Sequence, residues 1–86
     1  MPYTVVIKRQ AQKKLATLSE DESERLLFKI KSLGLNPSDP SLDIKKLAAS
    51  PFWRLRVGNW RVIYDRQDSV RIIAIERIKP RGDAYK

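Results

Sequence analysis

The sequence predicts a single α+β domain in which a strand, two helices and a three-stranded antiparallel meander follow one another. Three observations lead to this prediction. Residues 3–7 are mostly β-branched or aromatic, residues 11–33 repeat apolar side chains with helical spacing, and residues 52–78 alternate apolar and polar side chains. Two short helices can cover one face of a small sheet. The 86 residues are therefore expected to form one domain, residues 1–86.

Two helices are expected between the first strand and a proline-containing loop at residues 36–43. The apolar residues that share one face of the first helix are Ala11, Leu15 and Leu18. The second helix should begin at Ser19, because Ser19 followed by Glu22 is a capping box that satisfies free backbone amides. Gly34 follows its apolar stripe, where a left-handed C-terminal cap is expected.

From residue 52 onward the pattern is that of strands. Residues 52–57 and 60–66 are separated by Gly58 and Asn59, which tolerate positive φ and so favour a tight hairpin. Residues 67–69 are polar and predict a second turn into a strand at residues 70–78. The result is an antiparallel meander at the C-terminal end of the domain.

The charge and composition restrict the function. A formal net charge of +8 indicates an anionic partner, which is a nucleic acid, a membrane surface or an acidic protein segment. With no cysteine and no histidine, the chain has no disulfides, no thiolate or imidazole metal ligands and no imidazole catalysis. Its carboxylates are scattered, so no metal or other cofactor is expected. Without a signal-peptide pattern or a long apolar run, we expect a cytoplasmic protein that does not enter membranes.

Arginine becomes the main basic residue in the second part of the chain. It accounts for seven of the nine basic residues from position 51 onward, but for only two of the nine before it. The guanidinium fork binds phosphate through paired hydrogen bonds and stacks on bases. Nucleic acid is therefore favoured among the anionic partners, although a solvated strand surface would account for some of these arginines.

The first hairpin brings three arginines together. Arg54 and Arg56 lie two positions apart in one strand and point to the same face, and Arg61 lies just across the turn. The opposite face of that strand receives Trp53, Leu55 and Val57. The acidic residues close by in sequence are Asp65 and Asp68. These two are too few to neutralise the arginines, so either an anion binds among them or the strand faces solvent with carboxylate partners.

The C-terminal residues form a second basic group. Arg77, Lys79, Arg81 and Tyr85 lie within nine residues. A tyrosine near a chain end is often a packing anchor. Beside cations it can instead stack on a base of single-stranded RNA.

Two segments resemble the RelE/ParE superfamily of toxins from type II toxin–antitoxin systems. Lys46-Leu47 and the run FWRLRVGNWRVIY at residues 52–64 are similar to the family's basic strand, Arg-Val-Gly turn and Arg-Val-Ile-Tyr strand. The ending IKPRGDAY at residues 78–85 is similar to its terminal motif of a basic residue, an arginine and a tyrosine four positions later. The resemblance covers the whole chain, including the order of its elements.

The resemblance implies a RelE-like toxin that cleaves mRNA in the ribosomal A site and is neutralised by an acidic antitoxin. In such enzymes the 2′-hydroxyl of the RNA attacks the adjacent phosphorus and leaves a 2′,3′-cyclic phosphate. The positions that correspond to the family's catalytic residues are Arg54, Arg56, Arg61, Arg81 and Tyr85. The further basic residues expected to bind RNA are Lys45, Lys46, Arg77 and Lys79.

This chain departs from the family pattern in three ways. Members often have lysine where Arg54 and Arg56 stand, and many have a histidine near Pro80. Many also continue into a further C-terminal helix. Because arginine stays protonated, the residues do not identify a general base.

Two other function classes fit less well. A ParE-like inhibitor of DNA gyrase would perform no chemistry and would not need arginines arranged around a phosphate. A plain basic nucleic-acid-binding domain would be expected to show a recognition helix, and no such pattern is present.

Overall fold

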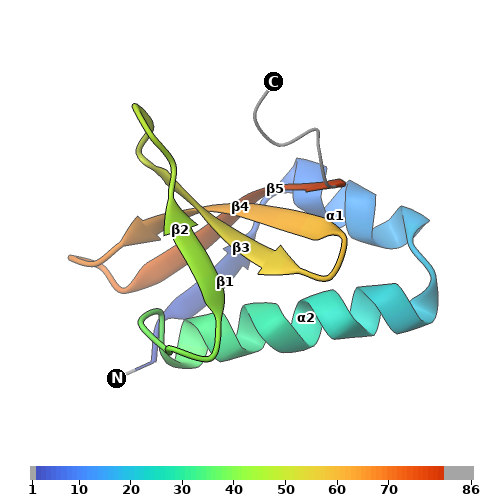
Figure 1. The fold of residues 1–86 in the computed structure, drawn as a ribbon, viewed down its shortest axis with the longest axis horizontal. Helices are drawn as coiled ribbons and strands as arrows, with labels where there is room; N and C mark the ends of the chain where they lie inside the picture. Colours follow the sequence, from blue (N-terminus) through green and yellow to red (C-terminus); the bar gives the residue numbers. More distant parts are fainter. Residues whose placement is uncertain (1, 81–86) are drawn as a thin grey trace.

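The computed structural model describes residues 2–80, so the predictions for Arg81 and Tyr85 lie outside the described residues. The elements are β1 (Thr4–Ile7), α1 (Arg9–Thr17), α2 (Glu20–Leu35), β2 (Asp43–Lys46), β3 (Phe52–Val57), β4 (Trp60–Gln67) and β5 (Ile72–Pro80) (Figure 1). The predicted order of strand, helical hairpin and meander is confirmed, and so is the α+β class. None of the described helices is long and apolar enough to span a membrane.

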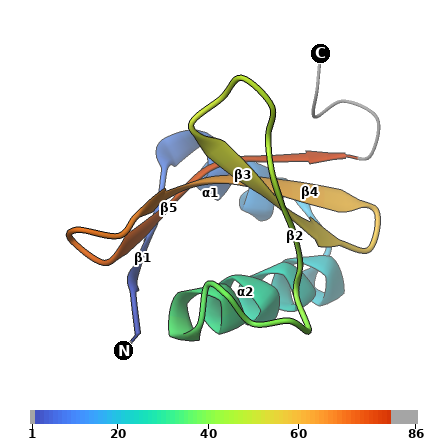
Figure 2. The same cartoon turned by 60° about the vertical axis from the view of Figure 1, so that its left-hand side comes forward.

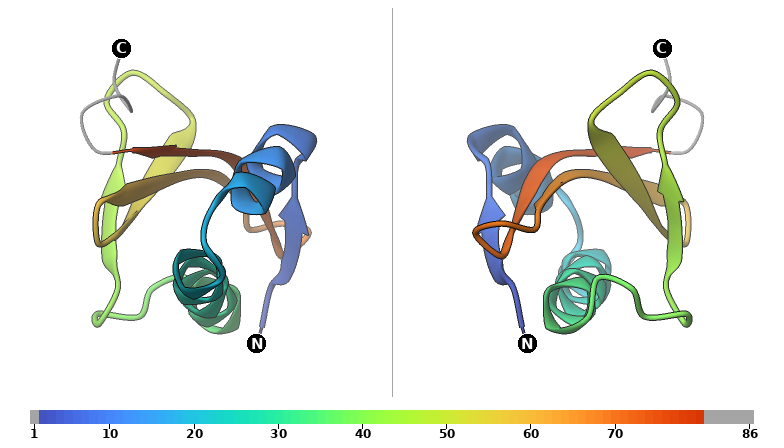
Figure 3. Two further views of the ribbon diagram at one scale, coloured as in Figure 1. Left: turned by 90° about the vertical axis from the view of Figure 1, so that its right-hand side faces the viewer. Right: turned by 90° about the vertical axis from the view of Figure 1, so that its left-hand side faces the viewer.

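The strands form one mixed sheet in the order β1-β5-β4-β3-β2. The meander of β3, β4 and β5 is antiparallel, and β1 pairs with β5 in parallel. Figure 3 shows the strands arching over both helices, which lie on the same side of the sheet. Neither helix of the described range, residues 2–80, lies on the opposite side of the sheet, which we call the outer face.

Strand β2 was missed by the sequence analysis, which ended a loop at residue 43 and assigned no element to residues 44–51. Its residues Asp-Ile-Lys-Lys are mostly poor strand formers. They are nevertheless extended because they pair with β3, where Asp43 lies opposite Arg56 and Lys45 opposite Arg54. Tertiary pairing overrides local propensity here, and it adds a strand beside the predicted hairpin.

The core lies between the helices and the inner face of the sheet. Its central residues, all 5% exposed or less, are Ala11, Leu26, Ile30, Leu33, Leu55, Val57, Val62, Tyr64, Ile73, Ile75 and Ile78. Leu55 and Val57 point inward as predicted, and Trp53 packs half-buried against the same cluster.

Helix α2 begins as predicted and ends differently. The Glu22 backbone N–H donates to the Ser19 hydroxyl at 3.2 Å, which confirms the predicted start. Gly34 does not form a left-handed cap, because the helix continues to Leu35 and Asn36 caps it. The position needs glycine for another reason, since a Cβ there would lie 2.6 Å from Val5 Cγ2. Gly34 thus allows α2 to approach β1 closely.

The two predicted turns also form. Gly58 has φ +57° and closes the hairpin between β3 and β4. In the second turn the Arg71 backbone N–H donates to the Asp68 carbonyl at 3.3 Å, and Arg71 itself has φ +54°. The last strand therefore begins at Ile72 rather than at residue 70, and it extends to Pro80.

Candidate nucleic-acid interface

The register of the sheet gathers basic side chains on the outer face. Arg56 pairs with Arg61, and Arg61 pairs with Lys79, so these three residues form one row across β3, β4 and β5. Directly paired residues share a face, with Cβ atoms about 4.5–5.5 Å apart. A second row holds Lys45, Arg54, Ile63 and Arg77. We call the cations of both rows the basic face: Lys45, Arg54, Arg56, Arg61, Arg77 and Lys79.

A groove of about 570 Å³ borders the basic face. The loop between β2 and β3, which rises beyond the sheet in Figure 2, supplies one wall. Phe52 and Ile63 give the groove apolar surface, while Arg77 and Lys79 give it charge. The complete lining is Leu47, Ser50, Phe52, Ile63, Glu76, Arg77 and Lys79. Apolar surface beside cations suits a nucleotide, whose base is flat and whose phosphate is anionic.

Arg54 is a buried cation with a carboxylate partner. It is only 8% exposed, and its Nη1 lies 3.3 Å from Asp43 Oδ1. Arg56 is more accessible and shares the same carboxylate, with Nη1 4.0 Å from Asp43 Oδ2. The sequence indicated only Asp65 and Asp68 as neighbouring acids, and this prediction missed Asp43, which lies 11 residues before Arg54. Arg54 is therefore partly neutralised, and of these two arginines Arg56 is the one more open to solvent.

The other predicted site residues separate into three groups. Arg61 lies half-buried in the middle of the first row, between Arg56 and Lys79. Lys45 and Arg77 are exposed at the two ends of the second row. Lys46 lies on the inner side, opposite Trp53, where its Nζ donates to the Ser50 carbonyl and lies 6.0 Å from the Trp53 ring centre. The structure therefore does not bring Lys46 to the basic face.

Glu76 lines the groove and was missed by the sequence analysis. The pairing shifts between Ile63 and Tyr64, which face Arg77 and Ile75, so Glu76 is the extra residue of a β-bulge. The bulge lets Ile75 and Ile78 both remain in the core while Glu76 leaves it. β-bulges often redirect a side chain next to a functional site. The irregular spacing of Ile73, Ile75 and Ile78 was the signal that could have revealed it.

Glu76 also has a basic partner. Its Oε2 lies 3.5 Å from the Nζ of Lys8, and its side chain is 26% exposed. Lys8 follows β1, so the ion pair joins the bulge to the edge strand. Among residues 2–80, Glu76 is the acidic residue that lines the groove.

Arg66 belongs to a separate structural cluster. Its Nε donates to Asp68 Oδ1 at 2.7 Å, and its guanidinium lies over the rings of Tyr3 and Trp53. Hydrogen bonds from the Tyr3 hydroxyl and from Arg66 lower the pKa of Asp68. These contacts occupy Arg66 in tying β1 to the turn after β4. In the described part of the chain, no three His, Cys, Asp or Glu residues come together as a metal site would require.

Comparisons with known proteins show to which family the chain belongs. Residues 5–85 match the family model of the ParE toxin of the type II toxin–antitoxin system, parDE. The toxin RelE1 of Methanocaldococcus jannaschii is 34% identical over 88 residues, and the match covers 100% of this chain and 98% of that protein. The archaeal RelE–RelB complex from Pyrococcus horikoshii contains a chain that is 33% identical, with a TM-score of 0.83 and coverage of 98% and 100%.

A more distant structure shares the fold. The RelBE2 toxin–antitoxin complex of Mycobacterium tuberculosis contains a chain that is 23% identical, with a TM-score of 0.77 and coverage of 96% and 95%. The family match spans nearly the whole chain, and its close relatives are RelE proteins. This chain therefore belongs to the RelE/ParE superfamily of type II toxin–antitoxin toxins and is a toxin of the RelE kind.

Proposed function

We propose that this toxin is a ribosome-dependent endoribonuclease that cleaves mRNA. The observation that carries the proposal is the row of Arg56, Arg61 and Lys79 beside a groove with both apolar and charged walls. Each of the three side chains is positively charged, and the phosphate of an RNA backbone is the anion that such a row attracts. An inhibitor that only binds another protein would have no need of this arrangement.

The row suits the charge that develops during RNA cleavage. The 2′-oxygen of the RNA forms a bond to the adjacent phosphorus while the bond to the 5′-oxygen breaks, which leaves a 2′,3′-cyclic phosphate. Negative charge builds up on the non-bridging oxygens of the pentacoordinate phosphorane. Arg61, flanked by Arg56 and Lys79, supplies fixed donors to those oxygens without reorganisation during the reaction.

The proton transfers need other residues, because arginine stays protonated. We propose that the Glu76 carboxylate accepts the proton of the 2′-hydroxyl, since it lines the groove together with Lys79. The Lys79 ammonium then protonates the leaving 5′-oxygen. Glu76 thus gains one proton and Lys79 loses one, so the two proton transfers need no metal ion.

The remaining residues bind or position the RNA. Phe52 and Ile63 provide the surface on which a base can pack, which holds the reacting phosphate in line. Arg77 and Lys45 attract the flanking backbone at the two ends of the second row. Arg81 and Tyr85 keep the roles that the family resemblance implies, as a late cation and a base-stacking aromatic.

The partners follow from the relatives and from the charge. The P. horikoshii and M. tuberculosis structures are toxin–antitoxin complexes. We propose that this chain likewise binds an antitoxin, and that the antitoxin carries an acidic segment, because the toxin has a net charge of +8. A ribosomal target places the toxin in the cytoplasm. The ribosome would hold the mRNA extended in the A site, which explains how a small site can act.

Inhibition of DNA gyrase is the second candidate, because the matching family model is that of the ParE toxin. Two assays on the purified toxin separate the candidates. In the first, pre-assembled ribosomes carrying mRNA are incubated with the toxin, and the cut ends are mapped and tested for a 2′,3′-cyclic phosphate. In the second, supercoiling by gyrase is followed. Cleavage without gyrase inhibition is expected, and the reverse would overturn the proposal.

Removal of metal tests the chemistry of the site. EDTA is added after the ribosomes have been assembled on the mRNA. We expect the cleavage rate of the toxin to remain unchanged, because no metal takes part in the proposed steps. The assay must verify by sedimentation that the ribosomes stay intact, since they need magnesium themselves. Cleavage that is lost on intact ribosomes and restored by magnesium or zinc would contradict the proposed chemistry.

A further inference from the structure

A small hollow of about 260 Å³ lies between α1 and the C-terminal end of β5, and we call it the α1–β5 pocket. Its lining residues are Gln10, Lys14, Arg77, Ile78, Lys79 and Pro80. β1 pairs with β5 as far as Ile75, and within residues 2–80 no strand lies beside the rest of β5 on this side, where α1 packs against it. The pocket therefore opens at the edge of the sheet and joins side chains of the outer face to side chains of α1.

The α1–β5 pocket is basic. Lys14, Arg77 and Lys79 line it, and among residues 2–80 no acidic side chain does. Within the same range none of these three cations lies within 4.0 Å of a carboxylate, because the ion pairs there are formed by other residues. Gln10 lies one helical turn before Lys14 and adds an amide that can donate a hydrogen bond. The pocket thus presents positive charge and hydrogen-bond donors to an anion.

Lys14 is held at the pocket by Trp60. Its Nζ lies 5.3 Å from the centre of the Trp60 ring, as in a cation–π contact. The Trp60 Nε1 in turn donates to Glu22 Oε2 at 3.1 Å, which links the ring to α2. A lysine on an open surface loses rotamer entropy when it binds a phosphate, whereas the contact with Trp60 already restricts Lys14. Lys14 is therefore preorganised to bind an anion.

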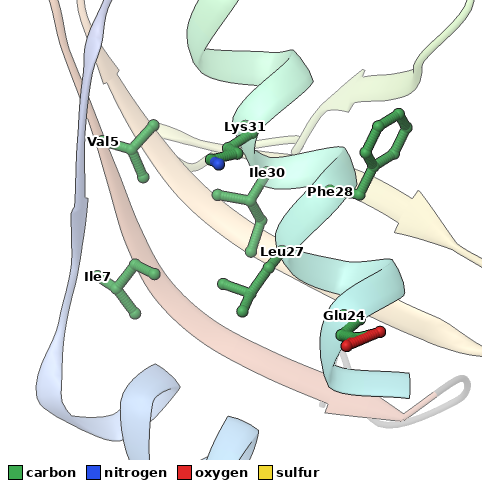
Figure 4. A pocket seen from close by; sticks show the side chains of 7 residues that line it. All are labelled: Val5, Ile7, Glu24, Leu27, Phe28, Ile30 and Lys31. Atoms are coloured by element: carbon green, nitrogen blue, oxygen red, sulfur yellow. The ribbon is translucent and has the colours of Figure 1, made fainter. Parts of the chain in front are cut away.

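The hollow between β1 and α2 shows that a basic lining is not a general feature of the cavities of this chain. It measures about 490 Å³ and is lined mostly by apolar side chains. Leu27 and Ile7 face one another across it (Figure 4). Its charged lining residues are Glu24 and Lys31, which have opposite charges. The α1–β5 pocket differs because its charged lining residues all have the same sign.

Two side chains connect the α1–β5 pocket to the groove beside the basic face. Arg77 and Lys79 line both hollows, so the two adjoin at these residues. An RNA strand that leaves the groove across Arg77 and Lys79 reaches the pocket next. The repeating phosphates of a single strand suit such a track of cations. The pocket is therefore placed to bind a phosphate next to the one in the groove.

We propose that the α1–β5 pocket binds the first phosphate on the 3′ side of the cleaved phosphate of the mRNA. This assignment rests on the proposed function, in which Glu76 accepts the proton of the 2′-hydroxyl and Lys79 protonates the leaving 5′-oxygen. The nucleotide on the 5′ side of the cut then lies in the groove, and the nucleotide that carries the leaving 5′-oxygen continues past Lys79 into the pocket. Lys14 and Arg77 bind its next phosphate, and Pro80 contacts its ribose.

This contact positions the strand and takes no part in breaking the bond. The groove holds the strand on one side of the reacting phosphate, and the pocket holds it on the other. Anchoring on both sides keeps the leaving 5′-oxygen in line with the attacking 2′-oxygen. The RNA-binding surface thereby extends from the sheet onto α1, where the resemblance to the family indicated no RNA-binding residue.

Chemical labelling of lysines tests the occupancy of the pocket without any cleavage. The free toxin is acetylated with and without a single-stranded oligonucleotide of 2′-O-methyl RNA, which has no 2′-hydroxyl to react. Mass spectrometry then gives the labelling of each lysine. Lys14 should become protected, whereas its exposed neighbour Lys13, which does not line the pocket, should not. Inorganic phosphate and ribosomes without mRNA are tested in the same way.

Removal of one charge from each partner tests which phosphate is bound. Lys14→Gln is compared with Lys14→Arg, which keeps the charge, and with Lys13→Gln, which removes a charge next to the pocket. Urea denaturation verifies that each variant is folded. Each is assayed at limiting toxin on ribosomes whose mRNA carries a neutral methylphosphonate at the first phosphate either 3′ or 5′ of the cleaved one.

We expect Lys14→Gln to slow cleavage of unmodified mRNA roughly tenfold, as the loss of one charged hydrogen bond does. Lys14→Arg and Lys13→Gln should cleave within about twofold of the wild-type rate. The 3′ methylphosphonate should slow the wild type as much as Lys14→Gln does, but it should not slow Lys14→Gln further, because the contact is already lost. The 5′ methylphosphonate should slow both proteins equally.

Full labelling of Lys14 beside the oligonucleotide, or additive effects of Lys14→Gln and the 3′ methylphosphonate, would overturn the proposal. Protection by inorganic phosphate but not by the oligonucleotide would assign the pocket to free phosphate and overturn it as well. The same holds for protection by ribosomes without mRNA but not by the oligonucleotide, since the occupant would then be ribosomal RNA. Protection by the oligonucleotide in a toxin that leaves mRNA uncut would instead refute the proposed function, while the pocket would still bind an RNA phosphate.

Discussion

The two faces of β3 and β4 differ completely, although alternate residues of the same strands form them. On the inner face, Leu55 and Val62 are opposite one another and have no exposed surface. On the outer face, their neighbours Arg56 and Arg61 are opposite one another and half-buried. The inner face packs against the helices, and the outer face carries most of the basic side chains of the sheet. Substitutions on the two faces should therefore change different properties.

The largest expected effect is that of Arg61→Ala on cleavage. Loss of one fixed donor to the transition state lowers a rate by roughly 10²–10³-fold. The free energy of unfolding should change much less than in a core variant, because the hydrophobic core does not contain Arg61. Cleavage of mRNA on ribosomes and urea denaturation measure the two quantities.

Two variants provide the controls for Arg61→Ala. Arg25→Ala removes the same charge from the exposed surface of α2 and should leave cleavage unchanged. Leu55→Ala creates a cavity in the core and should cost about 2–5 kcal/mol of stability. If Arg61→Ala cleaved as fast as the wild type while folded, the outer face would not be the catalytic one.

The second expected effect is that of Glu76→Gln. Replacing the proposed proton acceptor by a neutral amide should lower the cleavage rate roughly 10²-fold. RNA binding should not weaken, because the amide has nearly the same shape and its introduction removes a negative charge from the groove. Single-turnover cleavage on ribosomes measures the rate. A folded variant that cleaves as fast as the wild type would mean that another group, such as Tyr85, accepts the proton.

The contrast between the two faces was predictable from the sequence, but several site residues were not. Alternation in residues 52–66 correctly placed Leu55 and Val57 inward, and the Gly58 turn correctly brought Arg61 near Arg56. Asp43 could not be found this way, because its position depends on a strand with little intrinsic preference for extension. The pairing of β1 with β5 joins residues nearly 70 positions apart, as in Thr4 with Ile72, and no local pattern encodes it.

Lys46 and Glu76 show why alternation alone is insufficient for the site. The side of the sheet on which Lys46 lies depends on the register of β2 against β3, which puts it opposite Trp53. Glu76 leaves the core only because a bulge interrupts the alternation of β5. Register and bulges are set by the whole sheet, so the outer face could be predicted in outline but not residue by residue.

The third prediction concerns Tyr64, the polar member of the inner face. Burial raises the pKa of Tyr64 from 10.0 to about 12. Between these values the unfolded chain releases the phenol proton and the folded chain keeps it, so stability falls as the pH rises through this range. The loss across the whole range amounts to about 3 kcal/mol. Tyr64→Phe should lack it, and denaturation of both proteins at pH 9 and at the highest pH they tolerate measures the difference.

At neutral pH the same variant tests whether the Tyr64 hydroxyl contributes to the core. Among residues 2–80 the hydroxyl is buried without a hydrogen-bond partner, so Tyr64→Phe should be at least as stable as the wild type. Tyr3→Phe is the contrasting control, because the Tyr3 hydroxyl donates to Asp68 Oδ1 at 2.7 Å and its removal should destabilise the protein. A marked loss of stability in Tyr64→Phe would mean that the inner face depends on this polar group.

The smallest expected effect is that of Asp43→Asn. Asp43 influences both the stability of the fold and the charge of the basic face. Asp43 stabilises the fold by pairing with Arg54, which is 8% exposed, but it also reduces the positive charge of the basic face. Its neutralisation should therefore cost about 1 kcal/mol, which lies between the values for exposed and buried ion pairs. RNA binding should become slightly tighter, since one more cation is free to attract phosphate.

Asp43→Asn should therefore lower stability and raise RNA affinity. A variant that changes only the net charge of the protein should not combine these two effects. Glu24→Gln alters the net charge equally but lies on α2, away from the basic face, so it should strengthen RNA binding less and leave stability nearly unchanged. Urea denaturation and binding of a short RNA at two salt concentrations supply both quantities for each variant. If Asp43→Asn instead weakened both stability and RNA binding, Asp43 would position the side chains of the basic face for RNA rather than oppose their charge. Arg54, its partner, would then belong to the groups that contact the phosphate.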